Sequence, residues 1–94
     1  MTTFFMMGKY SSESIKDISS DRTDRSVRLI KQLGGKVKSM YALLGGYDVI
    51  LIVDFPSPEI AMKASLGLNV LTGISFNTFP AVAVDDFDKL IGEK

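Results

Sequence analysis

With 94 residues, of which 11 are acidic and 11 basic, the sequence predicts one small domain without net charge. Balanced charge argues against nucleic acid as a partner, because nucleic-acid binding needs an excess of cations on one face. Cysteine and histidine are absent, which excludes disulfides, thiolate metal sites and histidine-dependent catalysis. A chain with so thin a core, and with no expected metal or cofactor, is therefore expected to gain stability by oligomerisation.

The first predicted element is a strand over Thr2–Tyr10, which is apolar on both faces. A helical layer is predicted over Ser12–Leu33 and is broken near Ser20, where polar residues interrupt the apolar spacing. Either Ser20 or Asp21 is expected to cap the second helical piece. The pair Gly34-Gly35 is expected to end it.

Two further strands are predicted over Lys36–Leu44 and Tyr47–Asp54. The pair Gly45-Gly46 between them predicts a two-residue hairpin, because a type I′ turn needs positive φ at both central residues. A second helix is expected to follow, with Ser57 as its N-cap and Pro58 at its first position, where the missing N–H costs nothing.

The apolar face of the second helix continues to Leu71 and breaks at Gly73, although Gly67 or Asn69 could end the helix earlier. The last predicted strand covers Ile74–Val84 and contains Pro80, which places it at a sheet edge or a bulge. A short terminal turn or helix is expected over Asp85–Gly92. The resulting order, βαββαβ, predicts an α+β fold of ferredoxin-like type, with a four-stranded antiparallel sheet and helices on one face.

The predicted strands are apolar on both faces, although two helices can cover only one face of such a sheet. Phe4 and Phe5 point to opposite faces of the first strand, and Ile50 and Ile52 add to the second face. The uncovered face would expose several hundred square ångströms, roughly the size at which a patch marks a partner. This pattern predicts a homodimer or a multiple of dimers packed sheet to sheet, with an exposed ligand groove as the alternative.

Four short motifs resemble the GYD-domain family of small prokaryotic proteins over nearly the whole chain. They are Gly8-Lys9-Tyr10, Leu33-Gly34-Gly35-Lys36, Gly46-Tyr47-Asp48 and Thr78-Phe79-Pro80-Ala81, which occur in this order. The resemblance implies a dimeric α+β barrel, which is a ferredoxin-like protomer paired sheet to sheet. It implies no particular activity.

Two groups are candidate ligand-binding residues. Tyr47 offers a hydroxyl and Asp48 a carboxylate beside the turn; alternatively, Asp48 accepts backbone N–H groups and Tyr47 packs. Lys9 and Tyr10, together with Tyr41, could line a pocket between sheet and helices and polarise a carbonyl. The alternative is that Lys9 lies over apolar surface and Tyr10 closes the core.

Arginine recurs at every third position in the first helix, at Arg22, Arg25 and Arg28. Such a stripe can bind anions. Asp21 and Asp24 are interleaved with it, however, which favours a solvated, salt-bridged helix face.

The leading functional hypothesis is a small homo-oligomeric protein that binds a small molecule, with no catalytic residue assigned. A cofactor-free monooxygenase or isomerase on the same scaffold is one alternative, and a structural or regulatory assembly module is another. No apolar run approaches the ~20 residues that span a bilayer, and the N-terminus lacks the basic region of a signal peptide. We therefore expect a cytoplasmic protein with neither membrane nor nucleic acid as a partner.

Overall fold

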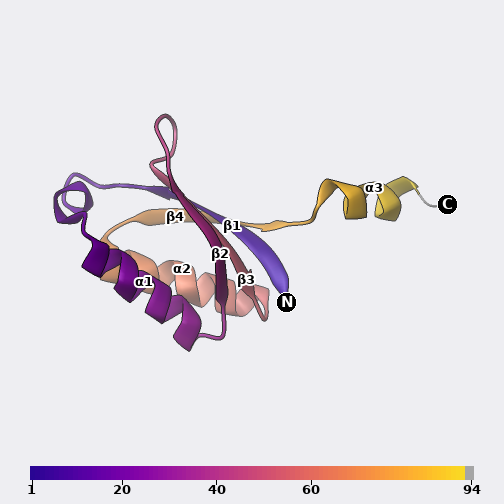
Figure 1. Ribbon diagram of the computed structural model, residues 1–94, viewed down its shortest axis with the longest axis horizontal. Coiled ribbons are helices and arrows are strands. Elements are labelled where there is room, and N and C mark those ends of the chain that lie inside the picture. The colour runs from indigo at the N-terminus through magenta and orange to yellow at the C-terminus, as the bar shows by residue number, and fades with distance from the viewer. Residues whose placement is uncertain (93–94) are drawn as a thin grey trace.

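The computed structural model describes residues 1–92 and has the predicted βαββαβ order. Its elements are β1 (Thr2–Lys9), α1 (Ser20–Gln32), β2 (Lys36–Ala42), β3 (Val49–Phe55), α2 (Pro58–Thr72), β4 (Ser75–Ala81) and α3 (Val84–Gly92), with a 3-10 helix at Ser14–Asp17. The strands form one antiparallel sheet in the order β2-β3-β1-β4. Helices α1 and α2 lie along one face of this sheet and leave the other face open (Figure 1). The predicted ferredoxin-like fold is confirmed.

The hydrophobic core lies between the sheet and the two helices. Met6 of β1, Phe55 of β3, Ile30 of α1 and Leu68 of α2 are all at most 1% exposed. The rings of Phe4 and Phe55 meet edge to face with 5.8 Å between their centroids. This packing fixes which face of each strand turns inward, and so which side chains remain on the open face.

Helix α1 begins one residue earlier than the sequence suggested. The Ser19 hydroxyl accepts a hydrogen bond from the backbone N–H of Arg22 at 3.1 Å, so Ser19 is the N-cap. The prediction of Ser20 or Asp21 as the cap was wrong, because both already lie inside the helix. The predicted end is confirmed: Gly34 follows the helix with a φ of 84°, which a glycine adopts without strain.

Helix α2 begins at the predicted cap and ends before Gly73. The Ser57 hydroxyl accepts from the backbone N–H of Ile60 at 3.2 Å, and Pro58 opens the helix. The break expected at Gly73 is confirmed, because the helix continues to Thr72 with Gly73 as its C-cap, and the alternative of an earlier end at Gly67 or Asn69 was wrong. At Gly67 the helix packs against α1, and a Cβ there would lie 3.4 Å from a methyl group of Leu29, at an ordinary contact distance. Tertiary packing therefore outweighs the low helix propensity of glycine.

The connection between β2 and β3 is a six-residue loop, residues 43–48, and the predicted two-residue hairpin was wrong. Only Gly45 has a positive φ, at 139°, whereas a type I′ turn needs two such residues. The loop is closed where the Leu43 N–H donates to the Asp48 carbonyl at 2.8 Å. Asp48 also donates its own N–H to the Gly8 carbonyl at 2.8 Å, so its backbone is fixed against β1.

Strand β4 is an edge strand, as Pro80 predicted. The chain then leaves the sheet, and α3 projects away from the rest of the molecule (Figure 1). No side chain of α3 is buried, and the molecule measures 52 Å along its longest axis against 30 and 18 Å along the others. Within residues 1–92, no helix has the length and apolar character needed to cross a membrane.

Candidate functional site

The Gly46-Tyr47-Asp48 motif lies at one end of the sheet, where it fastens the β2–β3 loop to the end of β1. The Asp48 carboxylate accepts the backbone N–H of Tyr10 at 2.8 Å. Together with the bond from the Asp48 N–H to Gly8, this contact extends the pairing of β1 and β3 beyond the last ladder pair. The carboxylate therefore has a structural role, and its role in ligand binding stays a prediction.

Two other candidate residues lie at the same end of the sheet. The Tyr47 hydroxyl accepts from the side-chain amide of Asn77 at 2.9 Å. The Lys9 ammonium group donates to the Gly46 carbonyl at 3.3 Å and is exposed. The fold thus gathers Lys9, Tyr10, Tyr47 and Asp48 at one place.

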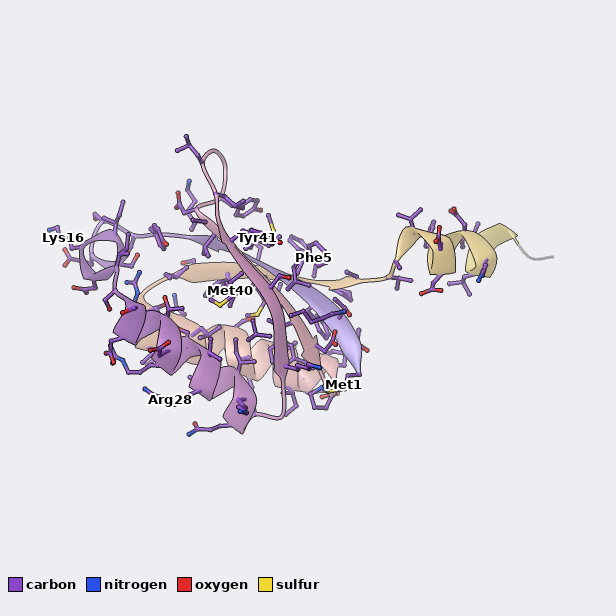
Figure 2. The ribbon with its side chains drawn as sticks, in the orientation of Figure 1. Met1, Phe5, Lys16, Arg28, Met40 and Tyr41 are labelled. Atoms are coloured by element: carbon purple, nitrogen blue, oxygen red, sulfur yellow. The ribbon has the colours of Figure 1, made fainter. Side chains whose placement is uncertain are left out.

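Tyr41 lies apart from this group, on the open face of the sheet. Figure 2 shows its side chain on the side away from the helices, while that of Met40 points toward them. Strict alternation from Val37, which packs on the core, would have turned Tyr41 inward. An irregularity between Val37 and Ser39 adds one residue to the strand and shifts every later side chain to the other face.

A cavity of about 60 Å³ lies between the sheet and the helices, and it is lined by Tyr10 but by neither Lys9 nor Tyr41. The expectation that all three would line such a pocket was wrong, because the pleat turns Lys9 and the irregularity turns Tyr41 to the open face. A space of this size holds a few water molecules. This cavity is too small for an organic ligand.

Arg22 forms part of the cavity wall and is a charged side chain that is nonetheless buried. It is only 7% exposed, and its Nη1 donates to the Ser14 carbonyl at 2.6 Å. Its guanidinium carbon lies 5.7 Å from the centre of the Tyr10 ring, within cation–π range. Within residues 1–92 it has no carboxylate partner.

The sequence predicted a solvated, salt-bridged arginine stripe, and this is confirmed for Arg25, which pairs with Asp21 at 3.0 Å. It was wrong for Arg22. The missed signal is the spacing of Arg22, Ser26 and Ile30, four residues apart, because it places Arg22 on the buried stripe of α1.

A surface cleft of about 410 Å³ opens on the other side of Arg22, at the N-terminal end of α1. Lys16, Arg22 and Arg25 supply three cations to its lining, and Asp17 supplies one anion. Leu71 and Thr72 of α2 complete the wall. Since Arg25 is already paired with Asp21, Lys16 and Arg22 are the cations left for a ligand, and they favour an anionic one. Among the residues that the structure describes, no cluster of acidic side chains could hold a metal ion.

An apolar groove of about 400 Å³ runs along the opposite edge of the molecule, between α2 and β4. Its lining includes Phe4, Met62, Leu66, Phe76 and Pro80 and no charged side chain. Met62 and Leu66 are 65% and 69% exposed, so this surface is available for packing and offers little to a polar ligand.

Comparison with solved structures shows the same fold in larger proteins. The Leucine response regulatory protein of Mycobacterium tuberculosis aligns with a TM-score of 0.58 at 10% sequence identity, over 86% of this chain and 50% of that one. Two structures of point mutants align with TM-scores of 0.57 and 0.58 at 11% and 10% identity, over 86% and 87% of this chain. The chain spans about half the length of each of these structures.

A search of curated proteins found no match. The model of the GYD domain, in contrast, matches residues 4–91, which include all four motifs that carried the resemblance. The chain therefore belongs to the GYD-domain family.

Proposed function

We propose that the protein is a subunit of a homodimer that binds a small anionic molecule in the cleft beside Arg22. One observation carries the proposal: Arg22 is a nearly buried cation that lacks a carboxylate partner within residues 1–92. Arg22 also lines the cleft, and we infer that a ligand there would reach its guanidinium group.

The cost of burying a charge supports an anion as the ligand. A buried guanidinium group is stable only where other groups compensate for its lost hydration. The Ser14 carbonyl and the Tyr10 ring compensate in part. A carboxylate or phosphate group would complete the compensation, because its two oxygens match the planar fork of N–H donors.

The size of the cleft favours a small metabolite. Its volume of about 410 Å³ falls in the range of ordinary small-molecule sites, roughly 300–1,000 Å³. Leu71 offers an apolar contact and Thr72 a hydroxyl beside the cations. A structural neighbour is named as a leucine response regulator. Since the two chains share only the fold, we take that name as a reason to test amino acids first.

The open face of the sheet supports the homodimer. Phe5 lies at its centre, paired with Ile52 on one side and Phe79 on the other. Tyr41 is 59% exposed and Phe79 48%, although both are aromatic. A second copy packed sheet to sheet would cover them. The cytoplasmic location expected from the sequence stays a prediction, which cell fractionation would check.

Isothermal titration with leucine, other α-amino acids, small dicarboxylates and inorganic phosphate tests the binding site. We expect one of these classes to bind, and Arg22→Met to weaken its binding at least about tenfold, because a charged hydrogen bond is lost. Arg28→Met is the matched control, since Arg28 is an exposed arginine of the same helix and lies outside the cleft. Equal binding by Arg22→Met and the wild type, or no binding of any class, would contradict the proposal.

A further inference from the structure

Helix α3 has an apolar side that no other part of residues 1–92 buries. At about 100° per residue, Val84, Phe87, Leu90 and Ile91 fall on one side of the helix. Each of these side chains is more than half exposed, from 52% for Phe87 to 72% for Val84 and Leu90. Surface helices with such a stripe normally bury it against another element.

The charges of α3 indicate what kind of surface would bind it. Asp86 and Asp88 border the apolar side, one on each flank, whereas Asp85 lies on the polar side. Lys89 is the only basic residue of the helix, so its net charge is negative. A matching surface would have an apolar centre and basic borders.

The groove between α1 and the edge strand β2 has this composition. It has a volume of about 450 Å³, and its lining combines the apolar Val27, Gly35 and Val37 with the basic Lys31 and Lys36. The groove between α2 and β4 is also apolar, but the charged residues next to its lining on α2 are Glu59 and Lys63, which cancel. Charge therefore favours the α1–β2 groove for an acidic helix.

The register of the sheet shows how a second copy could deliver α3 to this groove. Lys36, Asp54, Thr3 and Ala81 form one row across the four strands. The chain thus leaves β4 toward α3 at the same end of the sheet where β2 begins. Consider two sheets that pack face to face and are related by a two-fold axis parallel to the strands. Strand β4 of one protomer then lies over β2 of its partner. The rotation does not change the direction in which β4 runs along the axis. Helix α3 then emerges beside the partner's Lys36.

We propose that α3 is an exchanged arm that packs its apolar side into the α1–β2 groove of the partner subunit. In this arrangement Asp86 and Asp88 face the partner's Lys31 and the partner's Lys36. The proposal rests on the sheet-to-sheet dimer proposed above, and it assigns to that dimer a second contact.

A charge-swap series tests the contact in the full chain. We expect Asp86→Lys combined with Asp88→Lys to raise the dimer dissociation constant about tenfold at low salt, because attraction becomes repulsion. Adding Lys31→Glu and Lys36→Glu should restore the dimer dissociation constant to within about twofold of the wild-type value. Asp85→Lys, on the polar side of α3, is the matched control and should change little. Analytical ultracentrifugation at 50 and 500 mM salt measures each constant, and high salt should shrink the differences.

Disulfide trapping distinguishes an exchanged arm from one that folds back. Because the chain has no cysteine, a variant carrying Val27→Cys and Ile91→Cys can form disulfides only among these two positions, and peptide mapping identifies which two are joined. We expect covalent dimers on non-reducing denaturing mass spectrometry, with position 27 of one chain joined to position 91 of the other. A disulfide within one chain would overturn the exchange. The exchange would also be overturned if Lys63→Glu, in place of Lys31→Glu and Lys36→Glu, restored the dimer dissociation constant of the charge-reversed arm. If the wild type is a dimer and no substitution in α3 changes its dissociation constant, this inference alone is overturned. If the wild type is a monomer, the proposed dimer is overturned as well.

Discussion

Gly8 occupies a position in β1 where no side chain fits. A Cβ atom there would lie 2.6 Å from a methyl group of Val49 and 2.8 Å from the ring of Phe76. We expect Gly8→Ala to lower the free energy of unfolding by about 1–3 kcal/mol, because the core must shift to admit the methyl group. Urea denaturation measures the change. Gly46→Ala is the control, since nothing lies within 4 Å of its Cβ position, and equal effects of the two would contradict the steric explanation.

Asp48 belongs to the same end of the sheet and contributes through its carboxylate. Asp48→Ala leaves the Tyr10 N–H without its acceptor, and we expect a loss of about 1–2 kcal/mol and faster hydrogen exchange at that amide. Asp48→Asn keeps an acceptor oxygen and should retain most of the stability. If the asparagine variant were as unstable as the alanine variant, the hydrogen bond would not be the cause.

At the scale of residues, the role of a side chain could be predicted from the sequence where a local rule determines it. It could not be predicted where a contact between distant parts of the chain determines it. The alternative reading of Asp48 as an acceptor of backbone N–H bonds needed only its place beside glycines, and the structure shows such a bond. The burial of Arg22 depends on the Ser14 carbonyl and the Tyr10 ring, which approach it only in the folded chain. The side to which Tyr41 points depends on an irregularity in β2 that no turn residue announces.

Among the helices, the start of α2 offers a clean test of capping. Ser57→Ala removes the acceptor for the Ile60 N–H, and we expect a loss of about 1 kcal/mol, the usual value for an N-cap serine. Ser12→Ala is the control, because Ser12 is exposed and outside any helix. Thermal unfolding followed by circular dichroism compares the two, and a melting temperature unchanged by Ser57→Ala would contradict the role of the cap.

The order and type of the elements were predictable because apolar spacing and capping residues are local. The exact first and last residues of the elements were less predictable. Gly67 could have ended the helix, yet α2 continues through it to Thr72 where it packs beside Leu29 of α1. Gly45-Gly46 reads as a hairpin, yet the bonds of Asp48 to Gly8 and Tyr10 fix a longer loop. In both places the deciding contact comes from an element far away in the sequence.

For the whole molecule, the apolar open face makes a direct prediction. Phe5→Glu places a charge at the centre of that face, between Ile52 and Phe79, and should convert a dimer into monomers because the charge cannot be buried there. Size-exclusion chromatography with light scattering measures the mass. Leu66→Glu, on the outer side of α2, is the control and should leave the dimer intact. A Phe5→Glu dimer would mean that another surface joins the protomers.

The proposed exchange of α3 would link the shape of the protein to its concentration. A helix of nine residues is shorter than the ~12–15 that hold a helical form alone in water. If the arm is ordered only by docking, dilution would melt it, and free protomers would carry an acidic tail open to proteases. Dimers would then be degraded more slowly than free protomers. The lifetime of the protein would therefore depend on its own concentration.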